Sequence, residues 1–317
     1  MGCASIAVRS VIPAIKELVN EFEVVAVASR DIHKAQRVAK QFGCQAIEGY
    51  QQMIERNDID AIYMPLPTGL HFDWIKRSIN SGKHVYVEKS FALSCRDTEE
   101  LLMLAKDRKI ALMEGYMFQY HPQHKFVKEL INNDEIGEIR SFSASFCFPP
   151  LDKGNFRYDP KIGGGTILDA AGYTVRATCI ILGNALELEA ATVKYQNGCS
   201  IYGSAFMRGT NGLGIYLVFG FDNFYQCEYS ILGSKGKITL LKAFTPLKNE
   251  KPVCVLDKQN IKMTYSLPSC DHFIEAFKEF HNIINKSECR NRHYEDIMVQ
   301  SRILTDIFKI SSGPINE

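Results

Sequence analysis

The chain has 317 residues, of which 37 are Lys or Arg and 36 are Asp or Glu, so its formal net charge is +1. So small a charge gives no electrostatic reason to expect a nucleic acid or an anionic membrane as partner, and a small-molecule ligand fits better. A domain typically has roughly 100–200 residues, so the length predicts two domains.

The opening stretch, MGCASIA, has the pattern of a phosphate-binding turn of a dinucleotide fold. In such a turn a Gly forms the corner, a small residue two positions later admits the pyrophosphate, and a third small residue permits close helix–strand packing. Gly2, Ala4 and Ala7 have this spacing. We predict a helix over residues 6–20 and cofactor contacts from Gly2, Ala4, Ser5 and Ile6; an ordinary start of a helix is the alternative.

Up to residue 115, short apolar runs alternate with amphipathic stretches. The runs 23–29, 60–67, 83–90 and 109–115 predict strands, and residues 33–43, 72–83 and 96–109 predict helices. Continuous Val, Ile and Ala runs are typical of parallel strands covered on both faces, and Gly43 and Gly82 stand where helix ends need a left-handed residue. The pattern predicts a Rossmann-type, doubly wound parallel α/β domain over residues 1–116.

The strand that should feed the opening turn is missing from the sequence. In this fold it is the central strand, so its loss exposes the edges of both neighbours and removes a buried apolar run. Each large core side chain contributes about 1.5–3 kcal/mol, and several of them together rival the roughly 5–15 kcal/mol stability of a domain. We expect that the natural start lies upstream, that this chain is unstable or binds its nucleotide weakly, and that roughly five added β-branched residues repair both defects.

The end of the next predicted strand, ASRD, bears on the choice of cofactor. An acidic residue there would bind the ribose 2′-hydroxyl of NAD, whereas the Ser29 hydroxyl and the Arg30 guanidinium suit a 2′-phosphate. This favours NADP(H). NAD(H) stays open because Asp31 could reach a ribose, and a solvated loop is the remaining alternative.

Beyond residue 116 the pattern changes to longer β-rich segments. The segments 138–148, 186–195, 214–221 and 224–241 follow one another without intervening helices, as expected for a largely antiparallel sheet with one open face. Residues 271–285 and 294–310 have apolar residues at helical spacing. We predict an α+β second domain over residues 117–317.

The ten Cys residues stand singly, with no Cys-x-x-Cys pair and no Cys/His cluster at metal-ligand spacing. This favours reduced thiols and predicts no metal site. No apolar run approaches the roughly 20 residues that span a bilayer, and no charged-then-apolar leader precedes the first helix. We therefore expect a cytoplasmic protein with no membrane partner.

Several motifs in order resemble those of one family. They are GCASIA, ASRD, LPTGLH, GKHVYVEKS, MEGYMFQYHPQ, GEIRSF, FRYDPKIGGGTILDAAGY and GSKGKI. Over nearly the whole chain the sequence resembles the glucose–fructose oxidoreductase, inositol dehydrogenase and MocA-like superfamily. Within this superfamily the motifs most resemble those of the NADP-dependent 3-ketoreductases of nucleotide-linked deoxysugars. The resemblance implies hydride transfer from NADPH to a keto-sugar. A dehydrogenase of a free sugar, inositol or dihydrodiol, and a cofactor-binding protein without turnover, stay open.

The resemblance also implies catalytic residues. Lys89 takes the place of the lysine in the family's EKP motif and would polarise the substrate carbonyl, although Ser90 replaces the Pro. Asp169 and Tyr173 are four residues apart, hence on one helix face, and would project toward the reacting carbon, with Tyr173 as proton donor. A solvated strand-end lysine and an ordinary buried tyrosine are the alternatives.

Further contacts follow from the resemblance alone. Gln119 replaces an Arg common in the family, which weakens any phosphate clamp there. For His71 and His121 the alternative is a structural histidine whose hydrogen bonds are satisfied within the protein. For the segment 155–158 the alternative is an exposed loop. The family's pairing through the open sheet suggests a homo-oligomer. The implied cofactor contacts are Leu66, Thr68, His71 and Glu88, besides Lys89, and the implied substrate contacts are His121, Asn155, Arg157 and Tyr158.

Overall fold

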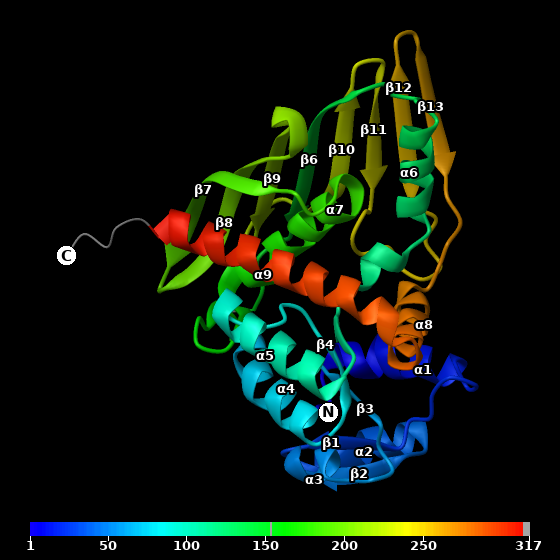
Figure 1. Cartoon of the computed structure of the whole chain (residues 1–317), viewed down its shortest axis with the longest axis vertical. Helices are drawn as coiled ribbons and strands as arrows, with labels where there is room; N and C mark the ends of the chain where they lie inside the picture. The colour runs from blue at the N-terminus through cyan, green and yellow to red at the C-terminus, as the bar shows by residue number, and fades with distance from the viewer. Residues whose placement is uncertain (153, 313–317) are drawn as a thin grey trace, which may run out of the picture. The chain divides into compact units, whose positions relative to one another are not determined.

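The structure, a computed structural model, describes residues 1–152 and 154–312 and divides them into two units (Figure 1). The first unit comprises Met1–Gly115 and Phe273–Met298, and the second comprises Tyr116–His272 and the chain from Val299 onward. The first junction lies one residue from the expected boundary. Residues 273–298, which we expected in the second domain, pack with the first unit instead.

The first unit alternates strands and helices, as predicted. Its helix α2 begins at Asp31, whose carboxylate accepts hydrogen bonds from two backbone N–H groups of the first turn, and ends at Gly43 with φ 70°. The elements of this unit are η1 (Ala7–Val11), α1 (Ile12–Glu17), β1 (Ala26–Ser29), α2 (Ile32–Phe42), β2 (Gln45–Glu48), α3 (Gln51–Ile54), β3 (Ala61–Met64), η2 (Thr68–Leu70), α4 (His71–Asn80), β4 (His84–Val87), α5 (Cys95–Arg108), β5 (Leu112–Glu114), most of α8 (His272–Asn285), η7 (Ser287–Cys289) and the first part of α9 (Arg290–Ser312).

The parallel strands of this unit form two small sheets, β1–β2 and β3–β4–β5. The first two residues of the chain bond to both of them. The Gly2 N–H donates to the Ala28 carbonyl of β1 at 2.8 Å, and the Met1 nitrogen donates to the Tyr63 carbonyl of β3 at 2.7 Å. Met1 and Gly2 therefore stand where the central strand of the fold was expected. The expected instability of the chain stays a prediction.

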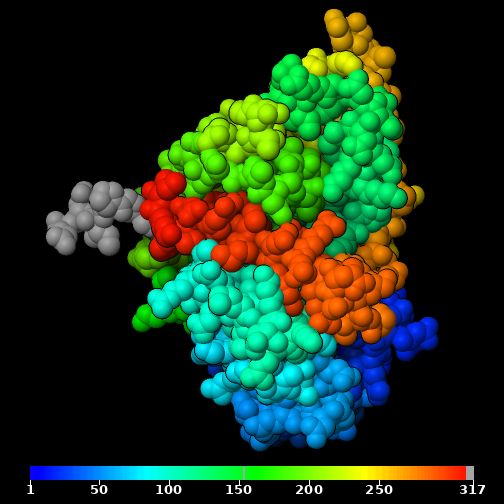
Figure 2. All heavy atoms as spheres, in the orientation of Figure 1, coloured from blue at the N-terminus to red at the C-terminus, as the bar shows by residue number. Residues whose placement is uncertain are grey.

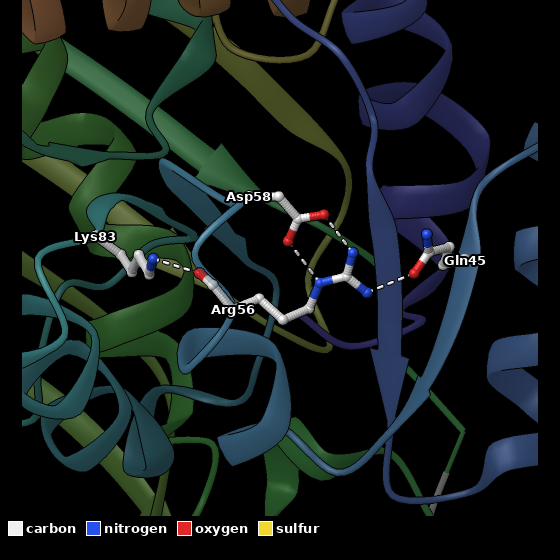
Figure 3. A network of polar contacts seen from close by, with 4 residues as sticks. All are labelled: Gln45, Arg56, Asp58 and Lys83. Carbon is white, nitrogen blue, oxygen red and sulfur yellow. Dashed lines mark hydrogen bonds and ion pairs between the residues drawn. The ribbon is translucent and has the colours of Figure 1, made fainter.

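A polar network joins the two sheets at their other ends (Figure 3). The Arg56 guanidinium pairs with Asp58 and donates to the Gln45 side chain at the start of β2. Lys83, which precedes β4, donates to the Arg56 carbonyl at 2.6 Å. One arginine thus ties segments that lead into β2, β3 and β4.

Residues 273–298 belong to the first unit because α8 adds an aromatic layer to its strands. The Phe277 ring stacks on Tyr86 of β4 with centroids 4.6 Å apart, and Phe280 stacks on Phe22 at 6.3 Å. The heptad-like apolar spacing of this helix predicted that it is buried, but not which unit buries it.

The second unit is built on one eight-stranded sheet of order β13-β12-β11-β10-β6-β9-β8-β7, antiparallel except for β6 and β9. The expected open-faced, largely antiparallel α+β architecture is confirmed. The elements are η3 (Met117–Tyr120), α6 (Gln123–Asn132), β6 (Ile139–Cys147), η4 (Phe156–Tyr158), η5 (Ile167–Ala171), α7 (Gly172–Leu182), β7 (Glu187–Gln196), β8 (Cys199–Arg208), η6 (Thr210–Gly212), β9 (Gly214–Gly220), β10 (Gln226–Gly233), β11 (Gly236–Leu241), β12 (Val253–Lys258), β13 (Ile261–Ser266) and the rest of α9.

Alternation along the strands gives this sheet one buried and one exposed face. In β9, Ile215, Leu217 and Phe219 are buried, whereas Tyr216 and Val218 are exposed. Helix α7 packs on the buried face over β6 and β9. The last turns of α9, red in Figure 2, carry apolar side chains to the surface, with Phe308 exposed by 54%.

A histidine lies in the core beside this sheet. The His124 side chain is buried, its Nδ1 lies 3.0 Å from the Tyr229 hydroxyl, and Phe118 packs edge-on to its ring. Burial lowers the pKa of His124 to about 3, and the neighbouring His121 and Lys128 act in the same direction. Between about pH 6.5 and pH 3 the folded protein therefore holds His124 mostly neutral, whereas an unfolded histidine is mostly charged.

We predict that acid weakens the fold through His124. Because its folded pKa lies below the unfolded value of about 6.5, the unfolded state binds the proton first, and stability falls as pH drops from 7 toward 3. At pH 5 the loss is about 2 kcal/mol in the free energy of unfolding. Urea unfolding at pH 7 and pH 5, followed by circular dichroism, measures it. His124→Gln should reduce the pH dependence, and an undiminished dependence contradicts the assignment; exposed His33→Gln is the control.

Candidate functional site

The candidate cofactor residues of the first unit follow the carboxyl ends of parallel strands. Ser29 ends β1, Leu66 and Thr68 follow β3, and Glu88 and Lys89 follow β4. The carboxyl ends of parallel strands form the ligand crevice of an open α/β sheet. The sequence-predicted residues of this unit therefore gather at the edge where a nucleotide binds in such folds.

The opening turn has the backbone that a phosphate-binding corner needs. Gly2 has φ 92°, in the left-handed region that favours glycine, and a Cβ there would lie 3.1 Å from Leu66 Cδ2. Helical residues begin at Ser5 and continue through η1 and α1, so the turn leads directly into the amino end of a helix. Free N–H groups at such an end suit an anionic phosphate.

Asp31 and Arg30 of the ASRD segment have different surroundings. Asp31 is engaged as the cap of α2, because its Oδ1 accepts from the His33 and Lys34 N–H groups, which argues against its reaching a ribose. Arg30 is exposed and lies beside the Tyr50 phenol: burial raises the pKa of Tyr50 and the Arg30 guanidinium opposes that rise. The Arg30 charge is therefore available at the edge of the crevice.

Two features of this corner were not predicted from the sequence. Lys34 and Arg37 add cations near the turn, since burial raises the pKa of the Cys3 thiol and both charges oppose the rise. Trp74 packs edge-on against Tyr50, with ring centroids 5.2 Å apart. The spacing of Lys34 and Arg37 on the first turns of α2 was the available signal for the cations.

Lys89 stands in a half-buried loop whose neighbours are fixed. The Glu88 side chain accepts a hydrogen bond from the Tyr63 hydroxyl at 2.7 Å, and the Glu88 N–H donates to the Met64 carbonyl at 3.0 Å. The Lys89–Ser90 peptide bond is cis. Tyr63, which the sequence analysis missed, therefore orients Glu88 next to the lysine.

His71 is engaged with the backbone rather than turned to the crevice. It is fully buried, and its Nδ1 and Nε2 each lie 2.8 Å from a carbonyl oxygen, of Ser90 and of Leu66 respectively. Burial lowers its pKa. This geometry favours the structural alternative for His71 over direct contact with a cofactor.

In the second unit, Asp169 is paired with Arg157. The Arg157 Nε donates to Asp169 Oδ2 at 2.8 Å, and the carboxylate side chain is only 12% exposed. Asp169 lies in the π-helical turn η5, a type of irregularity that is frequent at functional sites. The structure therefore brings two of the predicted residues, one from the catalytic and one from the substrate set, into direct contact.

Tyr173 is buried in an aromatic cluster. Tyr116 meets its ring edge-on at 5.3 Å, and Phe146 lies 4.6 Å from it. Gly172, just before it, makes room for Tyr116: a Cβ on Gly172 would lie 1.8 Å from the Tyr116 hydroxyl oxygen. Gln300 donates to the Gly172 carbonyl at 2.8 Å. These contacts fix the backbone that carries the proposed proton donor.

The remaining predicted substrate residues fall into two groups. His121 is buried, its Nδ1 accepts from the Gln123 N–H at 3.2 Å, its Nε2 has no partner among the described residues, and burial lowers its pKa to about 4. Asn155 accepts from the Arg157 N–H, and the Tyr158 hydroxyl donates to Asp222 and accepts from a backbone N–H. Asn155 and Tyr158 thus order their own loop.

Within residues 1–152 and 154–312, no group of three or more His, Cys, Asp or Glu side chains could hold a metal ion. The same part of the chain has no helix long and apolar enough to cross a membrane.

Comparison with known proteins identifies the family. A model described as "Oxidoreductase family, NAD-binding Rossmann fold" matches residues 1–116, and one described as "GFO/IDH/MocA C-terminal domain" matches residues 124–239. The chain belongs to this oxidoreductase family. The resemblance seen in its motifs is thereby confirmed.

Similar individual proteins act on nucleotide-linked sugars. The dTDP-3,4-didehydro-2,6-dideoxy-alpha-D-glucose 3-reductase of Actinomadura kijaniata is 36% identical over 306 residues, covering 96% of this chain and 92% of that protein. The enzyme of the same name from Saccharopolyspora spinosa is 39% identical over 282 residues, covering 88% and 85%.

A solved structure agrees over the same length. It is a tyrosine-to-phenylalanine mutant of KijD10, a 3-ketoreductase from Actinomadura kijaniata, in complex with TDP-benzene and NADP, with a TM-score of 0.94 and 35% identity over 98% of this chain and 96% of that one. A lysine-to-alanine mutant of KijD10 is also known in complex with TDP-benzene and NADP.

The contact between Gly172 and Tyr116 gives a prediction. We expect Gly172→Ala to lower the free energy of unfolding by about 1–3 kcal/mol, because the added methyl group overlaps the Tyr116 hydroxyl and one of the rings must move. Thermal unfolding measures the loss. Gly154→Ala is the matched control, since a Cβ there meets no atom within 4 Å; equal stability of the two variants contradicts the role given to Gly172.

Proposed function

We propose that this protein is an NADPH-dependent reductase that reduces a keto group of a nucleotide-linked deoxysugar. One observation carries the proposal: the lysine and the tyrosine altered in the KijD10 mutants are separated by the same number of residues as Lys89 and Tyr173. Those mutants were solved with NADP and a TDP compound. The two relatives named above support the same substrate class.

The residues at the crevice of the first unit fit a dinucleotide. The turn at Gly2 and the helix after it offer backbone N–H groups to the pyrophosphate. Ser29 and Arg30 would hold the 2′-phosphate, and Glu88 and the loop of Leu66 and Thr68 would line the ribose and nicotinamide end. When bound, NADPH supplies the hydride that adds to the carbonyl carbon of the keto-sugar.

The chain's own side chains would manage the charge and the proton. The Lys89 ammonium polarises the carbonyl and stabilises the negative charge that develops on its oxygen. The Tyr173 hydroxyl donates its proton to that oxygen, which completes the alcohol. Asp169, held by Arg157, is an acceptor that would orient the reacting groups. His121, whose buried Nε2 has no partner in the part of the chain that the structure describes, is a candidate for hydrogen bonding to the sugar.

The substrate class is tested directly. NADPH oxidation is followed optically with a panel of nucleotide-linked keto-sugars, and with free aldoses and inositols as comparison substrates. We expect turnover with the nucleotide-linked 3-keto-deoxysugars. Turnover with the free sugars alone would favour the dehydrogenase alternative, and NADPH binding without turnover on any substrate would favour the non-catalytic one.

Cofactor preference is the next prediction. We expect NADPH to bind more tightly than NADH by about 1.5–3 kcal/mol, the contribution of a charged hydrogen bond to the 2′-phosphate. Arg30→Ala should remove most of this difference while leaving the affinity for NADH unchanged. Isothermal titration calorimetry with both nucleotides measures it. Equal affinity of the unaltered protein for NADPH and NADH would contradict the role of Ser29 and Arg30.

The chemical roles give a further prediction. Lys89→Met should lower kcat by orders of magnitude with little change in NADPH affinity, because the lost interaction belongs to the transition state. Tyr173→Phe should do the same less severely. Steady-state kinetics and nucleotide titration separate the two effects. Unaltered kcat in both variants would exclude these assignments.

We also propose that the protein forms a homo-oligomer through the open face of its sheet and works in the cytoplasm. Exposed apolar side chains gather there on β8 and β9: Tyr202, Phe206, Tyr216 and Val218 are exposed by 37–54%. The rings of Phe206 and Tyr216 lie 5.1 Å apart. A contiguous exposed apolar patch is typical of an interaction surface. The ten cysteines stand singly in the sequence, with no Cys-x-x-Cys pair, which supports a reducing compartment.

The proposed homo-oligomer is tested by introducing a negative charge into the exposed apolar patch. Tyr216→Glu places a carboxylate in the patch beside Phe206, where burial between two subunits would be costly, so we expect a lower molar mass by light scattering. Met103→Glu, which replaces an exposed apolar side chain on α5 of the first unit, is the control. A monomeric unaltered protein would refute the proposal.

A further inference from the structure

The peptide unit that follows Lys89 is held at both ends by buried side chains. The Ser90 carbonyl oxygen lies 2.8 Å from His71 Nδ1, and the Phe91 N–H donates to Glu114 Oε1 at 2.8 Å. Because a peptide bond is planar, these two groups turn together. Any rotation of the Ser90–Phe91 peptide therefore disturbs both contacts.

The two side chains that hold this peptide come from β5 and α4. Glu114 is the last residue of β5, and His71 is the first residue of α4, after the loop that follows β3. Their exposed fractions are 5% and 0%. A hydrogen bond shielded from solvent in this way is strong, and removing one partner leaves a buried polar group unsatisfied.

His71 also connects the lysine loop to the loop after β3. Its Nε2 lies 2.8 Å from the Leu66 carbonyl oxygen, while its Nδ1 faces Ser90. Leu66 belongs to the proposed cofactor loop and Ser90 adjoins the proposed catalytic lysine. A neutral imidazole has one N–H, so the ring donates a hydrogen bond to one of these carbonyls and packs against the other, and it thereby lies between the two loops.

A third contact closes the arrangement from β5. The Gly115 N–H donates to the Val87 carbonyl at 2.8 Å, and a Cβ on Gly115 would lie 3.2 Å from Glu88 Cα. The backbone on both sides of Lys89 is therefore fixed by the end of β5: Val87 through Gly115 before it, and Phe91 through Glu114 after it.

We propose that Glu114 and His71 are positioning residues that set the direction of the Lys89 side chain by holding the Ser90–Phe91 peptide. The inference rests on the proposed function, in which Lys89 polarises the substrate carbonyl. Neither residue touches the reacting atoms; each acts on the rate through the lysine.

The experiment is a mutant cycle on kcat with NADPH and a nucleotide-linked keto-sugar. Glu114→Ala should lower kcat by about 10²-fold, the cost of a misplacement of about 1 Å, with little change in the KM for NADPH. In the Lys89→Met background the same change should leave the residual rate unaltered, because the group through which Glu114 acts is already gone. Glu114→Gln, which keeps an acceptor for the Phe91 N–H, should recover most of the rate.

Hydrogen exchange supplies a readout that needs no turnover. Glu114→Ala should speed amide exchange in residues 88–93 and leave β1 and β2 unchanged. Ser94→Ala is the control. The Ser94 hydroxyl caps α5 by accepting a hydrogen bond from the Asp97 N–H at 3.1 Å, and its removal leaves the contacts of the Ser90–Phe91 peptide in place. It should leave kcat unchanged. His71→Gln alters the contact at the other end of the peptide, and its effect on kcat is measured in the wild-type and Lys89→Met backgrounds in the same way. This variant tests the positioning role if Glu114→Ala does not fold.

The outcomes separate this inference from the proposed function. Unchanged exchange in residues 88–93, or equal loss of rate in the wild-type and Lys89→Met backgrounds, overturns the positioning role. A wild-type kcat in Lys89→Met alone overturns the proposed role of the lysine, and the positioning inference with it. Faster local exchange together with non-additive rates supports both.

Discussion

The hydrogen bond from the Gly115 N–H to the Val87 carbonyl, 2.8 Å long, is the constraint on which the rest of the candidate site depends. It continues the parallel pairing of β4 and β5 by one step beyond the strands, so that the loop after β4 starts from a fixed peptide. A side chain at position 115 would press on that same peptide, since its Cβ would lie 3.1 Å from the Val87 carbonyl oxygen. A side chain there would push the Val87 peptide by a few tenths of an ångström, and glycine avoids this.

The candidate site residues are positioned differently in the two units. In the first, short parallel strands end together and their loops carry the candidate cofactor residues, so that small changes at one strand end reach its neighbours. In the second, a broad sheet supports one helix, and Tyr173 and Asp169 depend on how that helix begins. The π-helical turn at Ile167–Ala171 and the close fit of Tyr116 on Gly172 set that beginning.

Much of this was accessible from the sequence. Strands β1, β3, β4 and β5 and helices α2, α4 and α5 of the first unit follow from apolar runs, helical spacing and the glycines at helix ends, and Gly43 and Gly82 have the expected positive φ, whereas β2 and α3 were not predicted. Strands β8, β12 and β13 were not predicted, and their places in the sheet are given by pairing with neighbouring strands. The placement of α8 depends on Tyr86 and Phe22, residues far away in the chain, and no local pattern contains that information. The same holds for Glu114, which in the sequence is one carboxylate at the end of an apolar run.

The contact of Trp74 with Tyr50 has a practical consequence. Trp74 is the single tryptophan of the chain, and its ring packs edge-on against the phenol that lies beside Arg30. All indole fluorescence of the protein therefore comes from a ring that is separated from Arg30, the proposed 2′-phosphate ligand, only by the Tyr50 side chain. The protein carries its own optical reporter there, so nucleotide occupancy can be followed without attaching a label, and energy transfer from the indole to a bound dihydronicotinamide would distinguish reduced from oxidised cofactor in the same cuvette.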